Sequence, residues 1–162
     1  MKKFTGSIAA VLLAVSLVAT PAQACWNNAE QDAARIANMN QMLMVSALRC
    51  RFGKQNFLSD YNKFIRFNND VLASQHHLIK ARYARTMGDK AAFAELDRFI
   101  ISLSNYYGGG HGDPDCAELE KLSKQLAVGR HDVNTLAQMA DRVVGVPKQA
   151  AQACSVSIAA RR

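Results

Sequence analysis

Apolar side chains recur every three or four residues along most of this chain, which is the spacing of an amphipathic α-helix. The clearest stretch runs over residues 29–52. Its apolar face consists of Ile36, Met39, Leu43, Ala47 and Cys50. Gly53 follows, and glycine suits the end of a helix. We therefore expect a first helix over 29–52, with this face packed against the rest of the chain.

A second helix is predicted over about residues 56–86, with Asn56 or Ser59 as its N-terminal cap. Its heptad-like stripe is formed by Leu58, Tyr61, Ile65, Leu72 and Ile79. Asn68 and Gln75 interrupt this stripe. Two interpretations stay open for them, because each is either a buried polar contact or a residue that faces solvent.

Three more helices are predicted from capping residues and apolar spacing. Gly88-Asp89 marks a turn before the third helix, Asp113-Pro114 is a good start for the fourth, and Asp132 caps the fifth. The expected inner faces are Phe93, Leu96, Ile100, Leu103 and Tyr107 in the third, Cys116, Leu119, Leu122 and Leu126 in the fourth, and Val133, Leu136, Ala140 and Val143 in the fifth.

The chain is long enough for one domain with a hydrophobic core and too short for two ordinary ones. No useful run of alternating apolar and polar residues indicates a strand. Short connections make neighbouring helices antiparallel. The predicted fold is therefore all-α, a disulfide-linked antiparallel bundle of four to five helices. It forms a single domain over residues 25–162 that includes a C-terminal tail.

Residues 1–24 have the pattern of a cleaved secretory signal peptide. Lys2 and Lys3 are followed by an apolar run over 8–19, and a small-x-small motif occupies 22–24. The apolar run is shorter than the roughly 20 residues that cross a bilayer. We expect export to the periplasm, cleavage after residue 24 and no transmembrane segment in the mature chain.

A lipid anchor at Cys25 is not expected, although this cysteine would be the first mature residue. Lipid-modified cysteines usually follow a leucine at minus three and a small residue at minus two. Ala22 and Gln23 occupy those positions here.

The four cysteines, Cys25, Cys50, Cys116 and Cys154, all follow the cleavage site, and an even number in an exported chain indicates disulfides. A bond between Cys25 and Cys50 is disfavoured, because the first helix separates them by about 35 Å. Either Cys50 pairs with Cys116 and Cys25 with Cys154, or the pairs are crossed, with Cys50 bonded to Cys154 and Cys25 to Cys116. The antiparallel order of helices favours the first pattern.

The exported part carries a net positive charge. Without Lys2 and Lys3 it has 18 basic and 13 acidic residues, a net charge of +5. Arg49, Arg51, Lys54, Lys63 and Arg66 cluster around the first predicted corner. We interpret them as a solvated basic face, with an anionic lipid surface or a glycan as the alternative partner. Nucleic acid is not expected, because no recognition motif is present.

The most unusual local sequence is the glycine-rich stretch over residues 106–113. It contains Tyr106, Tyr107, His111 and Asp113, with four glycines among them. As a possible ligand loop, it would offer a histidine, two phenols and free backbone N–H groups to an anion. The alternative is a plain connection that a nearby disulfide holds in place.

No catalytic, cofactor-binding or metal-ligating residues are predicted. His76 and His77 point about 100° apart on a helix, and the cysteines lack the spacing of a zinc or haem site. Met39, Met42 and Met44 fit the core of the first helix better than a copper site. We therefore expect no cofactor.

The run Met42-Leu43-Met44-Val45-Ser46-Ala47-Leu48-Arg49-Cys50-Arg51 is similar to one in small exported bacterial proteins of unestablished function. Cys25-Trp26, Asn105-Tyr106-Tyr107-Gly108 and Cys116 fit the same pattern. The resemblance spans residues 25–120 and implies export and a disulfide-bonded helical domain, but no activity. Some similar sequences carry the label S-adenosylhomocysteine hydrolase. This label does not fit, since that enzyme needs a large α/β dinucleotide-binding fold.

The function predicted from sequence is a non-enzymatic binding or accessory protein of the cell envelope. Its partner would be an envelope protein, a glycan or an anionic lipid surface. The alternative is a small enzyme or ligand carrier that uses the 106–113 loop.

Overall fold

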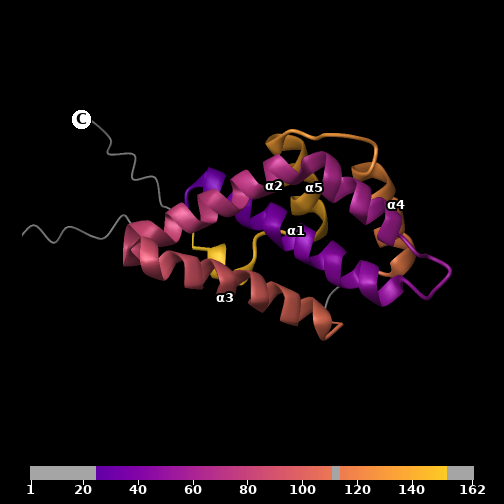
Figure 1. Cartoon of the computed structure of the whole chain (residues 1–162), viewed down its shortest axis with the longest axis horizontal. Helices are drawn as coiled ribbons and strands as arrows, with labels where there is room; N and C mark the ends of the chain where they lie inside the picture. Colours follow the sequence, from indigo (N-terminus) through magenta and orange to yellow (C-terminus); the bar gives the residue numbers. More distant parts are fainter. Residues whose placement is uncertain (1–24, 111–113, 153–162) are drawn as a thin grey trace, which may run out of the picture.

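The computed structural model describes residues 25–110 and 114–152, and this part of the chain is all-α (Figure 1). The predicted signal peptide and the last ten residues lie outside it. In chain order the helices are α1 (Asn28–Cys50), α2 (Leu58–Met87), α3 (Asp89–Gly108), α4 (Cys116–Leu126), α5 (Val133–Val143) and the short 3₁₀ helix η1 (Lys148–Ala150). No helix in the described part is both long and apolar enough to span a membrane.

Helix α1 is the central element of the bundle. Figure 1 shows it between α3 and α5, and it also contacts α2, α4 and η1. Its start is fixed by a capping box, in which the side chains of Asn27 and Glu30 each accept a hydrogen bond from the other residue's backbone N–H. Because neighbours surround α1, polar residues such as Asn38 and Gln41 are buried along with its apolar face.

The core consists of two clusters along this central helix. The larger one joins α1 to α2, α4 and α5, and it includes Met39, Met42 and Phe64. The smaller one joins the start of α1 to α2, α3 and η1 around Trp26 and Phe99. The core interpretation of Met39 and Met42 is therefore confirmed, whereas Met44 is only half-buried.

Helices α2 and α3 form an antiparallel pair that turns at Gly88. Gly88 has φ +80° and ψ 160°, a conformation that is essentially restricted to glycine. The predicted cap of α2 was wrong, because Phe57 occupies that position and makes no side-chain cap. Asn56 instead accepts a hydrogen bond from the backbone N–H of Leu58.

The predicted inner face of α3 was partly wrong. Phe93 is 60% exposed, whereas Phe99 is buried. The buried stripe runs through Ala92, Phe99, Leu103 and Tyr107, which is one position out of phase with Phe93. Ala92, the residue before Phe93, is fully buried four residues after the Gly88 turn.

The two short helices begin at aspartates. Asp115, rather than the predicted Asp113, caps α4 by accepting a hydrogen bond from the backbone N–H of Glu118. Asp113 itself lies outside the described residues. Asp132 caps α5 as predicted, accepting from the backbone N–H and the hydroxyl of Thr135.

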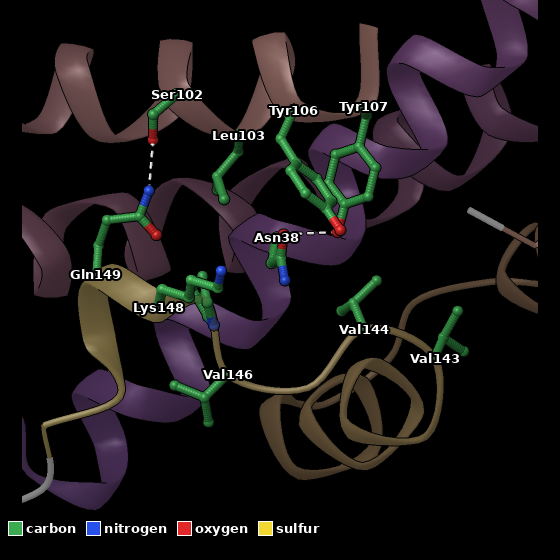
Figure 2. A pocket seen from close by; sticks show the side chains of 11 residues that line it. Asn38, Ser102, Leu103, Tyr106, Tyr107, Val143, Val144, Val146, Lys148 and Gln149 are labelled. Atoms are coloured by element: carbon green, nitrogen blue, oxygen red, sulfur yellow. Dashed lines mark hydrogen bonds between the residues drawn. The ribbon is translucent and has the colours of Figure 1, made fainter. Parts of the chain in front are cut away.

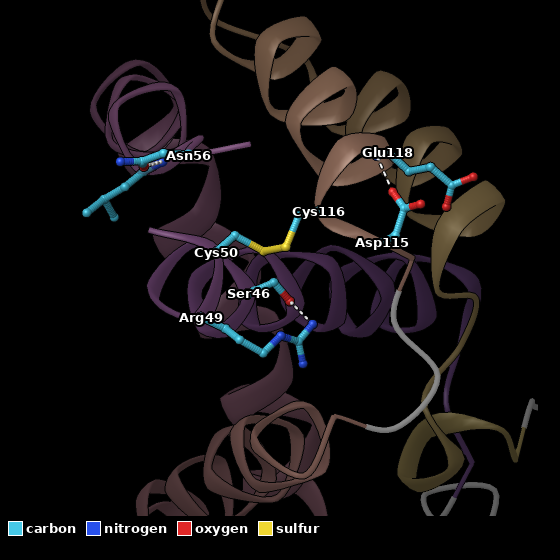
Figure 3. Close-up of a disulfide and its surroundings, with 8 residues drawn as sticks. Ser46, Arg49, Cys50, Asn56, Asp115, Cys116 and Glu118 are labelled. Atoms are coloured by element: carbon cyan, nitrogen blue, oxygen red, sulfur yellow. Dashed lines mark hydrogen bonds between the residues drawn. A yellow bond between two sulfur atoms is a disulfide. The ribbon is translucent and has the colours of Figure 1, made fainter. Parts of the chain in front are cut away.

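A disulfide joins Cys50 at the end of α1 to Cys116 at the start of α4, with Cα atoms 6.0 Å apart (Figure 3). Cys25 is also a disulfide cysteine. Its predicted partner, Cys154, lies outside the described residues. The chain after α5 does fold back along the bundle, as that pairing requires. The backbone N–H of Trp26 donates to the carbonyl of Gln152 at 2.9 Å.

Candidate functional site

The two tyrosines of the predicted ligand loop belong to the last turn of α3 rather than to a loop. Tyr107 is buried, and its hydroxyl donates a 2.8 Å hydrogen bond to Oδ1 of Asn38 on α1. Tyr106 is half-exposed, and its ring makes an edge contact with that of Tyr107, with centroids 5.1 Å apart. His111 and Asp113, the other two predicted loop residues, lie outside the described residues.

Both tyrosines line a cleft of about 390 Å³ between α3 and the segment that follows α5. Figure 2 shows side chains from both sides facing this cleft, with Asn38 behind them. The lining residues are Asn38, Ser102, Leu103, Tyr106, Tyr107, Val143, Val144, Val146, Pro147, Lys148 and Gln149. The volume is in the range of sites that bind small molecules.

The polar groups of the cleft are held in place by hydrogen bonds. Asn38 accepts from Tyr107 and donates through its Nδ2 to the carbonyl of Gly145 at 3.4 Å. It thereby connects α1 both to α3 and to the chain beyond α5. A buried amide that is bonded at both its oxygen and its nitrogen is fixed in orientation, so the Asn38–Tyr107 pair forms a rigid polar floor.

One rim of the cleft is closed by η1. Gln149 donates from its Nε2 to the hydroxyl of Ser102 on α3 at 2.9 Å (Figure 2). That hydroxyl in turn donates to the carbonyl of Phe99. Lys148 lies beside Gln149 on the same rim and is exposed. The segment after α5 is thus attached to α3 across the opening.

The cleft combines apolar walls with cationic and neutral polar groups. Leu103, Val143, Val144 and Val146 supply the apolar surface. Among the described residues that line it, none is acidic, and Lys148 carries the one charge. This arrangement can receive the apolar part of a small molecule and attract an anionic or hydrogen-bonding head group.

Three further titratable residues, Tyr61, His76 and His131, lie outside the cleft. Burial raises the pKa of Tyr61 to about 12, and its hydroxyl donates to Asn40 in the core. Burial, and secondarily the charge of neighbouring His77, lowers the pKa of His76. The backbone N–H of His131 donates to Asn68. Within residues 25–110 and 114–152, no three metal-ligating side chains lie together.

As candidate site residues, the sequence pattern identified only the two tyrosines of this cleft, whereas Leu103 and Val143 were expected only as parts of apolar faces. Asn38 was missed although it interrupts an apolar helix, and that interruption was the available signal. Lys148 and Gln149 gave no signal, because their position depends on how the chain after α5 returns to α3. No protein-family model, curated protein or solved structure matches this chain.

Proposed function

We propose that this protein is an exported, non-enzymatic binding protein of the cell envelope, and that its α3 cleft holds a small amphipathic molecule. The observation that carries the proposal is the combination of apolar walls, a rigid Asn38–Tyr107 floor and Lys148 on the rim of one cavity. Such a site fits a ligand with an apolar body and a neutral polar or anionic head.

Export to the periplasm is supported by the signal-peptide pattern over residues 1–24 and by the use of cysteine. Cys50 and Cys116 form a disulfide, and Cys25 is also disulfide-bonded. Disulfides persist in oxidising compartments such as the periplasm. The resemblance to small exported bacterial helical proteins points to the same compartment.

Binding is favoured over turnover by the state of the polar groups in the cleft. The hydroxyls of Tyr107 and Ser102 both donate hydrogen bonds within the protein. The acceptors are the side-chain amide oxygen of Asn38 and the backbone carbonyl oxygen of Phe99, and neither is a general base that activates a hydroxyl. These groups are therefore better placed to orient a ligand than to attack one.

The first test is native mass spectrometry of the protein purified from the periplasm, with an unreduced peptide map. A chain that begins at Cys25 and retains a small amphipathic molecule would support the proposal. A chain that retains its leader would contradict export. If nothing is retained, the cleft is tested by titration with a fluorescent amphipathic anion, anilinonaphthalene sulfonate.

We expect saturable binding of this probe at one site and at least about tenfold weaker binding in Lys148→Glu, which reverses the charge on the rim. Lys90→Glu is the matched control, because Lys90 is an exposed lysine in the first turn of α3 and does not line the cleft. Equal affinity in both variants, or no saturable binding, would contradict a ligand site in the cleft.

A further inference from the structure

The corner between α1 and α2 exposes apolar side chains that the fold leaves uncovered. Phe52 is 86% exposed, Leu48 is 49% exposed and Phe67 is 41% exposed. Figure 1 shows the connection over residues 51–57 projecting beyond the end of the bundle. An apolar ring at such a tip reaches a flat partner before the rest of the protein does.

The same corner is strongly basic. Residues 48–67 contain five basic side chains and one acidic side chain, a net charge of +4. Asp60, the acidic one, is already paired with Lys63 at 2.9 Å. The basic residues are Arg49, Arg51, Lys54, Lys63 and Arg66, and all five are exposed. The chain beyond residue 24 has a net charge of +5, so most of its basic excess lies at this end of the molecule.

Cationic and aromatic groups are interleaved at this corner. The guanidinium of Arg51 lies 4.4 Å from the ring centroid of Phe52, and that of Arg66 lies 5.5 Å from the centroid of Phe67. Each pair presents an apolar ring and a positive charge at nearly the same place. This matches the boundary of a bilayer, where acyl chains and anionic phosphates lie within a few ångströms of each other.

A polar hollow of about 480 Å³ lies beside these side chains. It is lined by Asn56, Leu58, Ser59, Asn62, Lys63 and Arg66. Amide, hydroxyl and cationic donors converge there, which suits a phosphate-bearing head group. The disulfide of Cys50 with Cys116 attaches the base of the corner to α4, so these groups sit on a fixed platform (Figure 3).

Exposure alone does not distinguish this corner. Phe93 on α3 is 60% exposed, but its helix carries Asp89, Glu95 and Asp97 beside Lys90 and Arg98. Charges of both signs surround Phe93, so this surface does not favour an anionic partner as the corner does. Phe93 and the basic residues away from the corner are therefore natural internal controls.

We propose that the α1–α2 corner docks on the surface of a membrane that contains anionic phospholipids. Phe52 enters the head-group region, Arg51 and Lys54 contact phosphates, and the hollow at Arg66 receives a head group. A glycan is less well matched, because the Arg51 guanidinium already lies over the Phe52 ring that would stack on a sugar. This surface is separate from the α3 cleft and does not depend on it.

The test is partition of the disulfide-intact protein onto vesicles of phosphatidylglycerol mixed with phosphatidylcholine, compared with phosphatidylcholine alone. We expect binding to the anionic vesicles only, weakening as ionic strength rises. Phe52→Ser should bind about tenfold more weakly, since it loses most of the apolar insertion. Phe93→Ser should bind like the unaltered protein.

Charge is tested with two double variants that change the net charge equally. Arg51→Glu/Lys54→Glu should reduce partition by about 25-fold or more, since each basic residue near an anionic surface contributes about fivefold. Lys90→Glu/Arg142→Glu should reduce it by less than about fivefold. Circular dichroism verifies that every variant is folded.

Three outcomes would overturn the proposal. Equal partition onto both kinds of vesicle would remove the role of anionic lipid. If both double variants lost the same amount of vesicle binding and Phe52→Ser lost none, the binding would depend on the net charge of the protein and not on this corner. Binding to a soluble anionic polysaccharide but to neither vesicle, with the same loss in Arg51→Glu/Lys54→Glu, would assign the corner to a glycan.

Discussion

Asn68 is a fully buried amide that connects α2 to the turn between α4 and α5. Its Nδ2 donates to the carbonyls of Phe64 and Gly129, and its Oδ1 accepts from the backbone N–H of His131 at 2.7 Å. The bonds to Gly129 and His131 cross more than sixty residues of chain. One side chain thus satisfies two backbone groups of this turn, which the ion pair between Arg130 and Asp70 also links to α2.

Replacing this amide should be costly. Asn68→Ala leaves the Gly129 carbonyl and the His131 N–H without their protein partner, so we expect unfolding free energy to fall by roughly 2–4 kcal/mol. The adjacent Asn69 is exposed, and Asn69→Ala should change stability by less than about 0.5 kcal/mol. Urea denaturation of both variants measures the difference, and equal midpoints would show that the Asn68 bonds contribute nothing.

His76 should titrate below its ordinary pKa of 6.5, because burial and then the charge of His77 disfavour the imidazolium. A folded-state pKa below the unfolded value gives a stabilising contribution that is present above pH 6.5 and is lost as the pH falls through the lower, folded-state pKa. NMR titration of the imidazole measures this directly. His77→Gln should raise the pKa of His76 part of the way back, and a His76 pKa at or above 6.5 would contradict the burial argument.

The residue scale also shows where sequence reasoning stops. Asn68 and Gln75 both interrupt the apolar stripe of α2, and the sequence did not decide whether each is buried or faces solvent. Both are buried. The decision depends on partners, and the partners of Asn68 lie in a turn whose position is set only when α4 and α5 pack. Local periodicity therefore marks such a residue as unusual without telling whether it is bonded.

At the scale of elements, apolar spacing located the helices well because each one buries a stripe against its neighbours. The register of that stripe was less certain in α3, where Phe93 and Phe99 both fit a helical period. Packing selected Phe99, which is buried against Trp26 in the smaller cluster, whereas Phe93 faces solvent. The partners of Phe99 come from other elements, so the sequence of α3 alone could not decide between the two patterns.

The turn between α2 and α3 gives a prediction at this scale. Gly88 has positive φ and no atom within 4 Å of the position of a Cβ, so Gly88→Ala tests backbone conformation without a steric clash. We expect a loss of about 1–3 kcal/mol. Gly108 is also uncrowded but lies within α3, and Gly108→Ala should be neutral or stabilising by up to about 1 kcal/mol. A harmless Gly88→Ala in urea denaturation would contradict the assigned conformation.

At the scale of the whole molecule, the chain after α5 connects the two core clusters and builds the cleft. Val143 and Val144 pack on the larger cluster, whereas Val146 and Ala150 belong to the smaller one around Trp26. The capping residues of α5 were readable from sequence. The course of the chain beyond α5 was considered only as a condition for pairing Cys25 with Cys154. The sequence therefore did not predict that residues 146–149 form a wall of the cleft.

The docking of this return segment is reported by the single tryptophan of the chain. Ala150 is fully buried in the Trp26 cluster, and its carbonyl accepts from Nε2 of Gln31. Ala150→Asp places a charge there, which is unfavourable in an apolar contact. The segment should therefore detach and expose Trp26 to water.

We expect the fluorescence emission of Trp26 to shift to longer wavelength in Ala150→Asp while circular dichroism retains the helices. Ala151→Asp is the matched control, since Ala151 is exposed, and its emission should stay unchanged. A blue, unshifted Trp26 emission in Ala150→Asp would show that α2 and α3 alone shield the indole. In that case the segment after α5 would not be needed to complete the hydrophobic core. The cleft wall at Lys148 and Gln149 would then be held in place by the hydrogen bond from Gln149 to Ser102.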